Sequence, residues 1–184
     1  PTFRHEAFEQ YKAQREETPE AIRLSVPIIK EIIRAYRIPI LEVAGYEADD
    51  VIGTLATEAG RQGIITYMMT PDKDYGQLVS DKVFMYRPKH TGGFEVMGVD
   101  EVKAKFDIQS PAQVIDMLGL MGDSSDNIPG CPGVGEKTAQ KLIAEFGSIE
   151  NLLEHTDQLK GALKTKVETN REMITFSKFL ATIK

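Results

Sequence analysis

Apolar residues recur at helical spacing through the first forty residues of the chain. Phe3, Ala7 and Tyr11 lie four residues apart, which predicts a highly charged helix over residues 3–15. A second stripe advances in alternating steps of four and three residues and predicts a helix over residues 20–36: Ile22, Val26, Ile29, Ile33 and Tyr36. Because proline lacks an N–H and clashes with the preceding turn, Pro27 should kink or restart this second helix.

The middle of the chain alternates between strand and helix patterns. Residues 39–43 predict a short strand, and the residues after Gly45 predict a helix with one apolar face: Ala48, Val51, Ile52, Leu55, Ala56 and Ala59. The unbroken apolar run at 64–70 is typical of a buried parallel strand. Strand, helix and strand in this order form a βαβ unit with a right-handed crossover. Residues 81–88 and 94–97 predict a β-hairpin that turns at His90 to Gly93.

From residue 100 onward the pattern is helical. Two helices are expected at 100–106 and 111–120, and a capping box at Ser110 opens the second. A turn rich in glycine and proline then leads into a helix with a buried stripe: Ala139, Leu142, Ile143 and Phe146. Gly147 should end that helix, Ser148 should cap the next, and residues 159–183 are largely helical. The predicted fold class is α/β, a mostly parallel sheet flanked by helices, followed by an all-helical C-terminal part.

The net charge of −6 is concentrated in the middle of the chain. Residues 41–129 hold seven Lys or Arg against fifteen Asp or Glu, which gives −8, whereas each flank carries +1. Seven of the carboxylates fall in three clusters: Glu47, Asp49 and Asp50; Asp72 and Asp74; Asp123 and Asp126. The second cluster follows the strand at 64–70, at the sheet edge where ligands bind in open α/β folds. Scattered surface acids are the alternative interpretation.

Converging carboxylates would repel one another and raise their own pKa values unless cations neutralised them. Hard divalent ions prefer oxygen ligands, so Mg²⁺ or Mn²⁺ is the expected cofactor. The sequence offers no Ser/His or Cys/His pair for nucleophilic catalysis. Two ions about 4 Å apart could instead ready a water and stabilise the leaving oxygen in phosphodiester hydrolysis.

Other functional classes receive little support from the composition. No apolar run approaches the roughly 20 residues of a membrane span, and no signal peptide is evident. The single Cys131 cannot form an internal disulfide, so a reducing cytoplasm is expected. The three histidines, His5, His90 and His155, are far apart and expected at the surface, which argues against zinc. The start at Pro1, directly on a helical pattern, indicates a piece of a longer chain.

Gly133-Val134-Gly135 between two predicted helices suits a helix-hairpin-helix. Free backbone N–H groups and a helix N-terminus can hold a phosphate without reading bases. Lys137 adds positive charge nearby. A plain glycine turn between packed helices is the alternative.

Five ordered motifs follow one another along the chain. They are Thr2-Phe3-Arg4-His5-Glu6; Gly45-Tyr46-Glu47-Ala48-Asp49-Asp50; Asp72-Lys73-Asp74 with Gln77-Leu78; Gly122-Asp123-Ser124-Ser125-Asp126-Asn127; and Pro132-Gly133-Val134-Gly135-Glu136-Lys137-Thr138-Ala139. With these motifs the chain resembles the 5′-nuclease (flap endonuclease) domain of bacterial DNA polymerase I. The resemblance covers essentially all 184 residues.

The resemblance implies a divalent-metal nuclease that removes 5′ flaps and RNA primers from duplex junctions, within a chain that continues into polymerase domains. Its core is PIN-like at residues 1–122, with an arch helix near 1–17, and residues 123–184 form a helix-hairpin-helix subdomain for duplex binding. The implied roles are as follows. The tighter metal site takes Glu47, Asp49, Asp50 and Asp72, and the second takes Asp74, Asp123 and Asp126. Arg4 and Lys12 contact the scissile phosphate, and Arg15, Gly133, Val134, Gly135, Lys137 and Thr138 bind DNA. Carbonyls at Cys131 and Val134 hold K⁺.

The chain departs from the family pattern in two respects. The family begins with a central strand that bears a metal-binding Asp and has another just before the Phe-Arg-His-Glu motif, and neither is in these 184 residues. The chain alone is therefore expected to bind metal poorly and to cleave slowly or not at all. Tyr75 also replaces the apolar residue usual after the second Asp. A free-standing 5′ nuclease, or a DNA-binding module without catalytic activity, are the alternatives.

Overall fold

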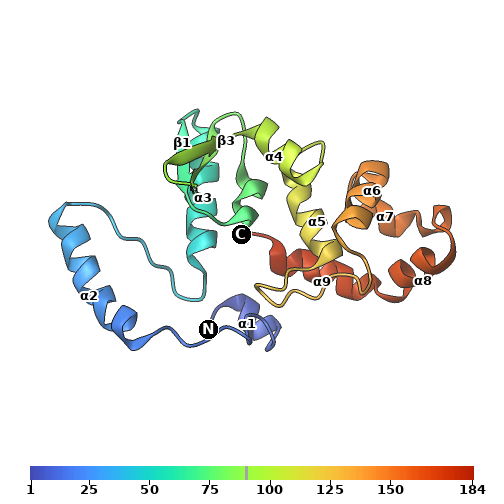
Figure 1. Ribbon diagram of the computed structural model, residues 1–184, viewed down its shortest axis with the longest axis horizontal. Helices are drawn as coiled ribbons and strands as arrows, with labels where there is room; N and C mark the ends of the chain where they lie inside the picture. The colour runs from blue at the N-terminus through green and yellow to red at the C-terminus, as the bar shows by residue number, and fades with distance from the viewer. Residues whose placement is uncertain (90) are drawn as a thin grey trace.

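A computed structural model describes residues 1–89 and 91–184 (Figure 1). His90, and with it part of the predicted hairpin turn, lies outside the described residues. Within them, no helix is long and apolar enough to cross a membrane.

The sheet has three strands in the order β1-β2-β3. β1 (Thr66–Met69) pairs in parallel with β2 (Val83–Pro88), with Thr66 opposite Val83. β2 pairs antiparallel with β3 (Phe94–Met97), with Met85 opposite Met97, so the predicted hairpin is confirmed. Residues 39–43 form no strand, and that prediction is wrong in this structure. An extended apolar segment becomes a strand only where a neighbouring strand accepts its hydrogen bonds, and within residues 1–89 and 91–184 no strand pairs with this segment.

One face of the sheet is buried and the other is open. Met68, Val83, Met85 and Met97 are buried on the side covered by the long helix α3 (Ala48–Arg61) and by α4 (Val99–Phe106). The opposite face carries exposed apolar side chains: Tyr67, Met69, Phe94 and Val96. The parallel strand predicted within 64–70 is therefore present as β1, but the prediction that it is buried holds for one face only.

The N-terminal helices differ from the prediction for residues 3–15. α1 spans only Phe3–Ala7, and turns follow because Lys12 adopts a positive φ of 55° and donates its N–H to the Asp126 carbonyl (3.0 Å). α2 (Glu20–Ala35) continues through Pro27 without restarting. No residue of α2 is buried, so water can solvate the carbonyl that Pro27 leaves without a partner. Figure 1 shows α2 standing away from the remainder of the molecule.

The C-terminal half is helical, as predicted, and its helices are α5 (Val114–Met121), α6 (Glu136–Phe146), α7 (Ile149–Glu154), α8 (Gly161–Thr169) and α9 (Arg171–Ala181). Three short 3₁₀ helices connect elements: η1 (Lys73–Leu78), η2 (Pro111–Gln113) and η3 (Thr156–Gln158). α5 is the central helix, and it packs along α9 and against α6 and η1 (Figure 1). Met117, Leu118 and Leu120 on α5 are fully buried, which joins the two halves into one core.

We expect Leu118→Ala to lower the free energy of unfolding by about 2–5 kcal/mol, because it leaves a cavity at the centre of this core. Denaturant unfolding followed by circular dichroism would measure the change. Leu24→Ala, the same substitution at a side chain that is 64% exposed, should change it by no more than about 0.5 kcal/mol. Equal effects of the two substitutions would contradict the described core.

Candidate metal and nucleic-acid site

The first acidic cluster opens α3, with Glu47 as the residue before its first turn. Gly45 supplies the positive φ of 83° that turns the chain into the helix. Three carboxylates at one helix N-terminus gain from the helix dipole, about 0.3–1 kcal/mol each. Glu47 is also held by three side chains: Lys12 Nζ donates to Oε1 (2.6 Å), and Arg4 Nη1 (2.9 Å) and the Tyr11 hydroxyl (3.0 Å) donate to Oε2.

Asp49 and Asp50 point in different directions from the same turn. Asp49 Oδ1 accepts a hydrogen bond from the Tyr75 hydroxyl (2.7 Å). Burial raises the pKa of Asp49 and outweighs the opposing effects of Tyr75 and Lys12. Asp50 is 1% exposed and forms a bidentate pair with Arg4. Burial alone would raise the pKa of Asp50, but its hydrogen bonds from Arg4 and two backbone N–H groups lower it.

The second cluster lies just beyond the C-terminal end of β1, as the sequence predicted. Asp72 caps η1 by accepting the Asp74 N–H at 3.0 Å. Burial raises the pKa of Asp74 to about 6, and the nearby charges of Asp72 and Asp123 add to the rise. Asp74 Oδ1 is buried and accepts no hydrogen bond, although Lys73 Nζ lies 3.2 Å away. Lys73 therefore offsets the charge of this oxygen without donating a hydrogen bond to it, which a buried carboxylate oxygen normally accepts.

The third cluster follows α5. Asp123 accepts the Ser125 N–H at 2.7 Å and pairs with Lys73. Burial would raise the pKa of Asp123, but Lys73 and Ser125 lower it. Asp126 accepts a hydrogen bond from Arg15 Nη2 (2.6 Å), and Lys12 Nζ lies 3.4 Å from it. The Tyr11 hydroxyl lies 3.1 Å from Asp126 Oδ2, so its single hydrogen is shared between Asp126 and Glu47.

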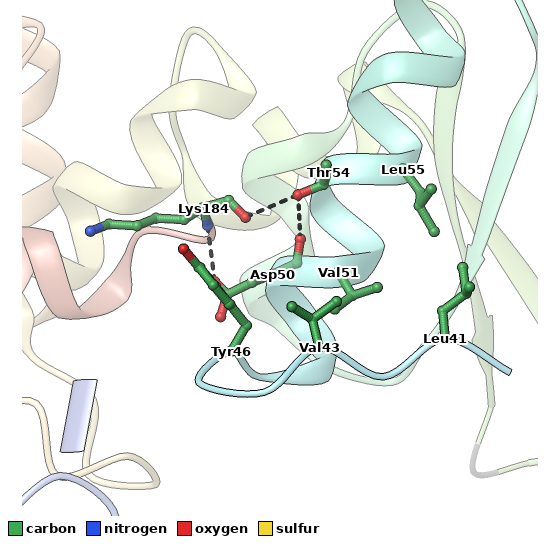
Figure 2. Close-up of a pocket in the computed structure, with 8 residues that line it drawn as sticks. All are labelled: Leu41, Val43, Tyr46, Asp50, Val51, Thr54, Leu55 and Lys184. Atoms are coloured by element: carbon green, nitrogen blue, oxygen red, sulfur yellow. Dashed lines mark hydrogen bonds between the residues drawn. The ribbon is translucent and has the colours of Figure 1, made fainter. Parts of the chain in front are cut away.

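Two adjoining cavities connect six of the seven predicted acids. A cavity of about 440 Å³ is lined by Asp72, Asp74, Asp123 and Asp126 together with Arg15, Lys73, Arg87 and Lys105. A much smaller one, about 10 Å³, is lined by Glu47, Asp49, Asp74 and Asp126 among others. Asp74 and Asp126 line both cavities. Asp50 lines neither, and instead borders a cavity of about 510 Å³ with mostly apolar walls behind α3 (Figure 2).

The acids provide suitable oxygens for a hard divalent ion, and the orphaned buried oxygen of Asp74 fits a cation. Among the described residues, however, no three acidic, His or Cys side chains already stand in metal-binding geometry. The reason is visible in the contacts, because Lys12, Lys73 and Arg15 occupy carboxylate oxygens that an ion would use.

Arg4 does not lie open to a phosphate, as the family resemblance implied. Its side chain is 3% exposed, and all five of its side-chain N–H groups donate hydrogen bonds, to Glu47, Asp50 (two), Leu180 O and Thr182 O. In this structure Arg4 therefore has no N–H group free for a phosphate. Lys12 is only slightly exposed, at 13% of its side chain, whereas Arg15 is 54% exposed.

Several side chains at the site escaped the sequence analysis. Tyr11 and Tyr75 donate to the acids, and burial raises the pKa of both phenols, so they stay protonated donors. In the sequence, Tyr75 differs from the surrounding pattern only as a departure from the family motif. Arg87 and Lys105 come from β2 and α4, and only the fold brings them to the larger cavity.

The glycine turn of the predicted helix-hairpin-helix lies between α5 and α6. Gly133 has a φ of 76°, and its carbonyl accepts a hydrogen bond from Lys166 Nζ at 3.3 Å. Gly135 precedes the first turn of α6, whose Lys137 is exposed and whose Thr138 is half-buried. Cys131 and Val134 are buried, and the Cys131 carbonyl already accepts the Val134 N–H at 2.9 Å.

Two family models account for nearly the whole chain. Residues 1–107 match the 5′-3′ exonuclease N-terminal resolvase-like domain, and residues 109–184 match the 5′-3′ exonuclease C-terminal SAM fold. The chain belongs to the 5′-3′ exonuclease family. The family read from the sequence motifs and the predicted fold class are both confirmed.

Individual relatives agree with this assignment. DNA polymerase I of Bacillus caldotenax is 45% identical over 185 residues, covering 100% of this chain and 21% of the relative. T5 5′-exonuclease with bound zinc has a TM-score of 0.81 at 23% identity, covering 98% of this chain and 69% of that one. A flap endonuclease of bacteriophage T5, complexed with DNA and metal ions, has a TM-score of 0.79 at 24% identity, covering 97% and 69%. The chain thus spans about a fifth of the polymerase's length. The two phage structures are similar to this chain in fold.

In the metal-free protein we expect the Asp74 carboxyl to titrate near pH 6, because burial raises its pKa to about 6. An Asp in the unfolded chain titrates near pH 3.9. The folded state therefore holds this proton more tightly, and the free energy of unfolding should fall as the pH rises from about 4 to 6. Carbon-13 NMR of the carboxyl in the presence of a chelator would measure the pKa. A titration near pH 4 would contradict the described burial, and Asp74→Asn should remove this part of the pH dependence.

Proposed function

We propose that this chain is a structure-specific 5′ nuclease domain that hydrolyses phosphodiesters at 5′ flaps and RNA primers during DNA replication and repair. The observation that supports this best is the convergence of six carboxylates from three segments on two adjoining cavities. The family's 5′-3′ exonuclease description and the flap endonuclease with DNA and metal ions point the same way.

The proposed cofactor is a pair of Mg²⁺ or Mn²⁺ ions. Glu47, Asp49 and Asp72 would hold the first ion, and Asp74, Asp123 and Asp126 the second. When bound, such ions lower the pKa of a bound water and offset charge on the phosphate. Asp50 was predicted as a ligand. We leave it out because each of its carboxylate oxygens already accepts two hydrogen bonds and because it borders the apolar cavity beside α3.

Cationic side chains of the site would serve the phosphate. Lys12, Lys73 and Arg15 now offset the charge of the acids. Once metal offsets that charge, their N–H groups are free to bind the non-bridging oxygens of a scissile phosphate. Arg87 and Lys105 extend positive charge along the larger cavity, where a DNA backbone would lie.

The helix-hairpin-helix would hold the duplex away from the cleavage point. Gly133 and Gly135 would offer backbone N–H groups at the start of α6, and Lys137 and Thr138 lie in its first turn. Val134, whose N–H is bonded to the Cys131 carbonyl, would contribute by its place in the turn. Such contacts fix position without reading sequence. A K⁺ ion near the carbonyls of Cys131 and Val134 is part of the same proposal. We also keep as a proposal the division into a nuclease core at 1–122 and a duplex-binding part at 123–184, with polymerase domains as further parts of the full-length protein.

A DNA-binding module without catalysis is the second candidate. It is favoured by one observation, that within residues 1–89 and 91–184 the acids are already paired with internal cations rather than arranged around an ion. The two functions differ in whether the acids are needed for cleavage.

Asp49→Asn in the full-length protein should reduce Mg²⁺-dependent flap cleavage by at least about 10–100-fold, because a metal ligand loses its charge. The measurement is single-turnover cleavage of a labelled 5′ flap. Asp107→Asn, the same change at an exposed aspartate at the end of α4, is the control and should leave the rate unchanged. If Asp49→Asn cleaves as fast as the parent protein, the catalytic proposal fails.

Lys137→Ala should weaken binding of flap DNA equally for different sequences, because Lys137 is proposed to contact a phosphate. The slope of log affinity against log salt should decrease in magnitude by about 1. Fluorescence anisotropy in Ca²⁺, across a range of salt concentrations, would measure both quantities. Lys89→Ala, which removes an exposed lysine from the end of the hairpin strand, should leave the slope unchanged. A sequence-dependent loss would contradict the phosphate contact.

A further inference from the structure

A buried ion pair joins α1 to the acidic helix α3. Arg4 Nη1 donates to Asp50 Oδ2 and Nη2 donates to Asp50 Oδ1, both at 2.8 Å. The two residues are 2% and 1% exposed. A planar guanidinium that meets a carboxylate in this two-pronged way fixes the orientation of both groups.

The remaining acceptor positions of Asp50 are also taken. The Glu47 N–H donates to Oδ2 (3.0 Å) and the Lys184 N–H donates to Oδ1 (3.0 Å). Figure 2 shows the bond between Asp50 and Lys184, beside the one that Thr54 makes to the Lys184 carbonyl. Each carboxylate oxygen therefore accepts two hydrogen bonds, which is its usual capacity. Asp50 has no lone pair available to an ion unless these bonds break.

Residues 180–184, which we call the C-terminal strap, pass from the end of α9 to this ion pair. Arg4 Nε donates to the Leu180 carbonyl (2.9 Å) and Nη2 donates to the Thr182 carbonyl (2.6 Å). Gln77 of η1 makes two further bonds to the strap, to the Ala181 carbonyl (3.0 Å) and from the Ile183 N–H (2.8 Å). The strap is thus tied to α1, α3 and η1 at once.

These ties reach the acids that line the two cavities. Arg4 Nη1 donates to Glu47 Oε2 as well as to Asp50. Gln77 lies in the same 3₁₀ helix that carries Asp74. α9, which leads into the strap, packs along α5, and α5 leads to Asp123. All three acidic segments are therefore connected to the C-terminal strap, either by hydrogen bonds or through packed helices.

We propose that Arg4 and Asp50 are positioning residues: they form a lock that holds the C-terminal strap against α3 and orients Glu47, and Asp50 is withheld from metal. The inference that the lock positions acids for catalysis depends on the proposed nuclease function. The existence of the lock depends only on the contacts of Arg4 and Asp50.

The test compares Asp50→Asn with Asp49→Asn in the full-length protein by two readouts that do not depend on cleavage. Electron paramagnetic resonance counts bound Mn²⁺, and hydrogen-exchange mass spectrometry follows the amides of residues 180–184. For Asp50→Asn we expect the parent number of Mn²⁺ ions and an exchange rate in the strap raised by about tenfold or more, because a charged acceptor is lost. For Asp49→Asn we expect Mn²⁺ affinity lowered by about 10–100-fold and an unchanged strap.

Cleavage adds a third readout for Asp50→Asn. A positioning role predicts a lower kcat with an unchanged KM for flap DNA and an unchanged Mn²⁺ count. Loss of an ion by Asp50→Asn, with the strap as protected as in the parent protein, would overturn the proposal. If instead Asp49→Asn leaves Mn²⁺ binding and cleavage intact, the nuclease function fails while the exchange data still decide the lock.

Arg4→Lys is the second variant, should Asp50→Asn not fold. It keeps the charge but loses the two-pronged geometry and the bonds to Leu180 and Thr182. Its strap should exchange about tenfold faster or more, and the double substitution with Asp50→Asn should add little, because both remove the same lock. Fully additive effects would overturn the proposal.

Discussion

The mutual repulsion of seven carboxylates is the constraint on which the rest of this structure depends. Three chain segments far apart in sequence bring these groups to one end of the sheet. Burial alone would raise the pKa values of Asp49, Asp74 and Asp123 there. The chain offsets the cost with its own cations. Arg4, Lys12, Lys73 and Arg15 each pair with one or two of the acids, and Tyr11 and Tyr75 donate hydroxyl groups. Among the described residues, the only buried side-chain oxygen that accepts no hydrogen bond is Asp74 Oδ1.

These pairings divide the acids by role. Arg4 and Asp50 are buried and use all their donors and acceptors on each other, on the backbone and on Glu47, so they act within the framework of the fold. The side chains of Lys12, Lys73 and Arg15, which pair with the other acids, are more exposed than that of Arg4. A divalent ion would replace these three cations and leave the Arg4–Asp50 pair in place.

Local sequence patterns predicted the fold class, the hairpin, the helical half and the clusters of acids. They could not predict features that depend on distant partners. Residues 39–43 have a strand pattern but no neighbouring strand, and the helix expected through Arg15 ends early because the Lys12 N–H bonds the Asp126 carbonyl. Asp49 and Asp50 are adjacent residues of the same type, so the sequence alone does not distinguish them. Their different surroundings arise from the 100° step along a helix and from the strap, which lies more than 130 residues away.

If the six cavity-lining acids form a site for divalent ions, a crystal of the full-length protein grown with Mn²⁺ should show the bound ions. We predict anomalous difference density among Glu47, Asp49, Asp72, Asp74, Asp123 and Asp126, with Lys12 and Lys73 moved off their carboxylates and Asp50 still paired with Arg4. Absence of Mn²⁺ density at these six acids, with both lysines still in their present ion pairs, would contradict the account.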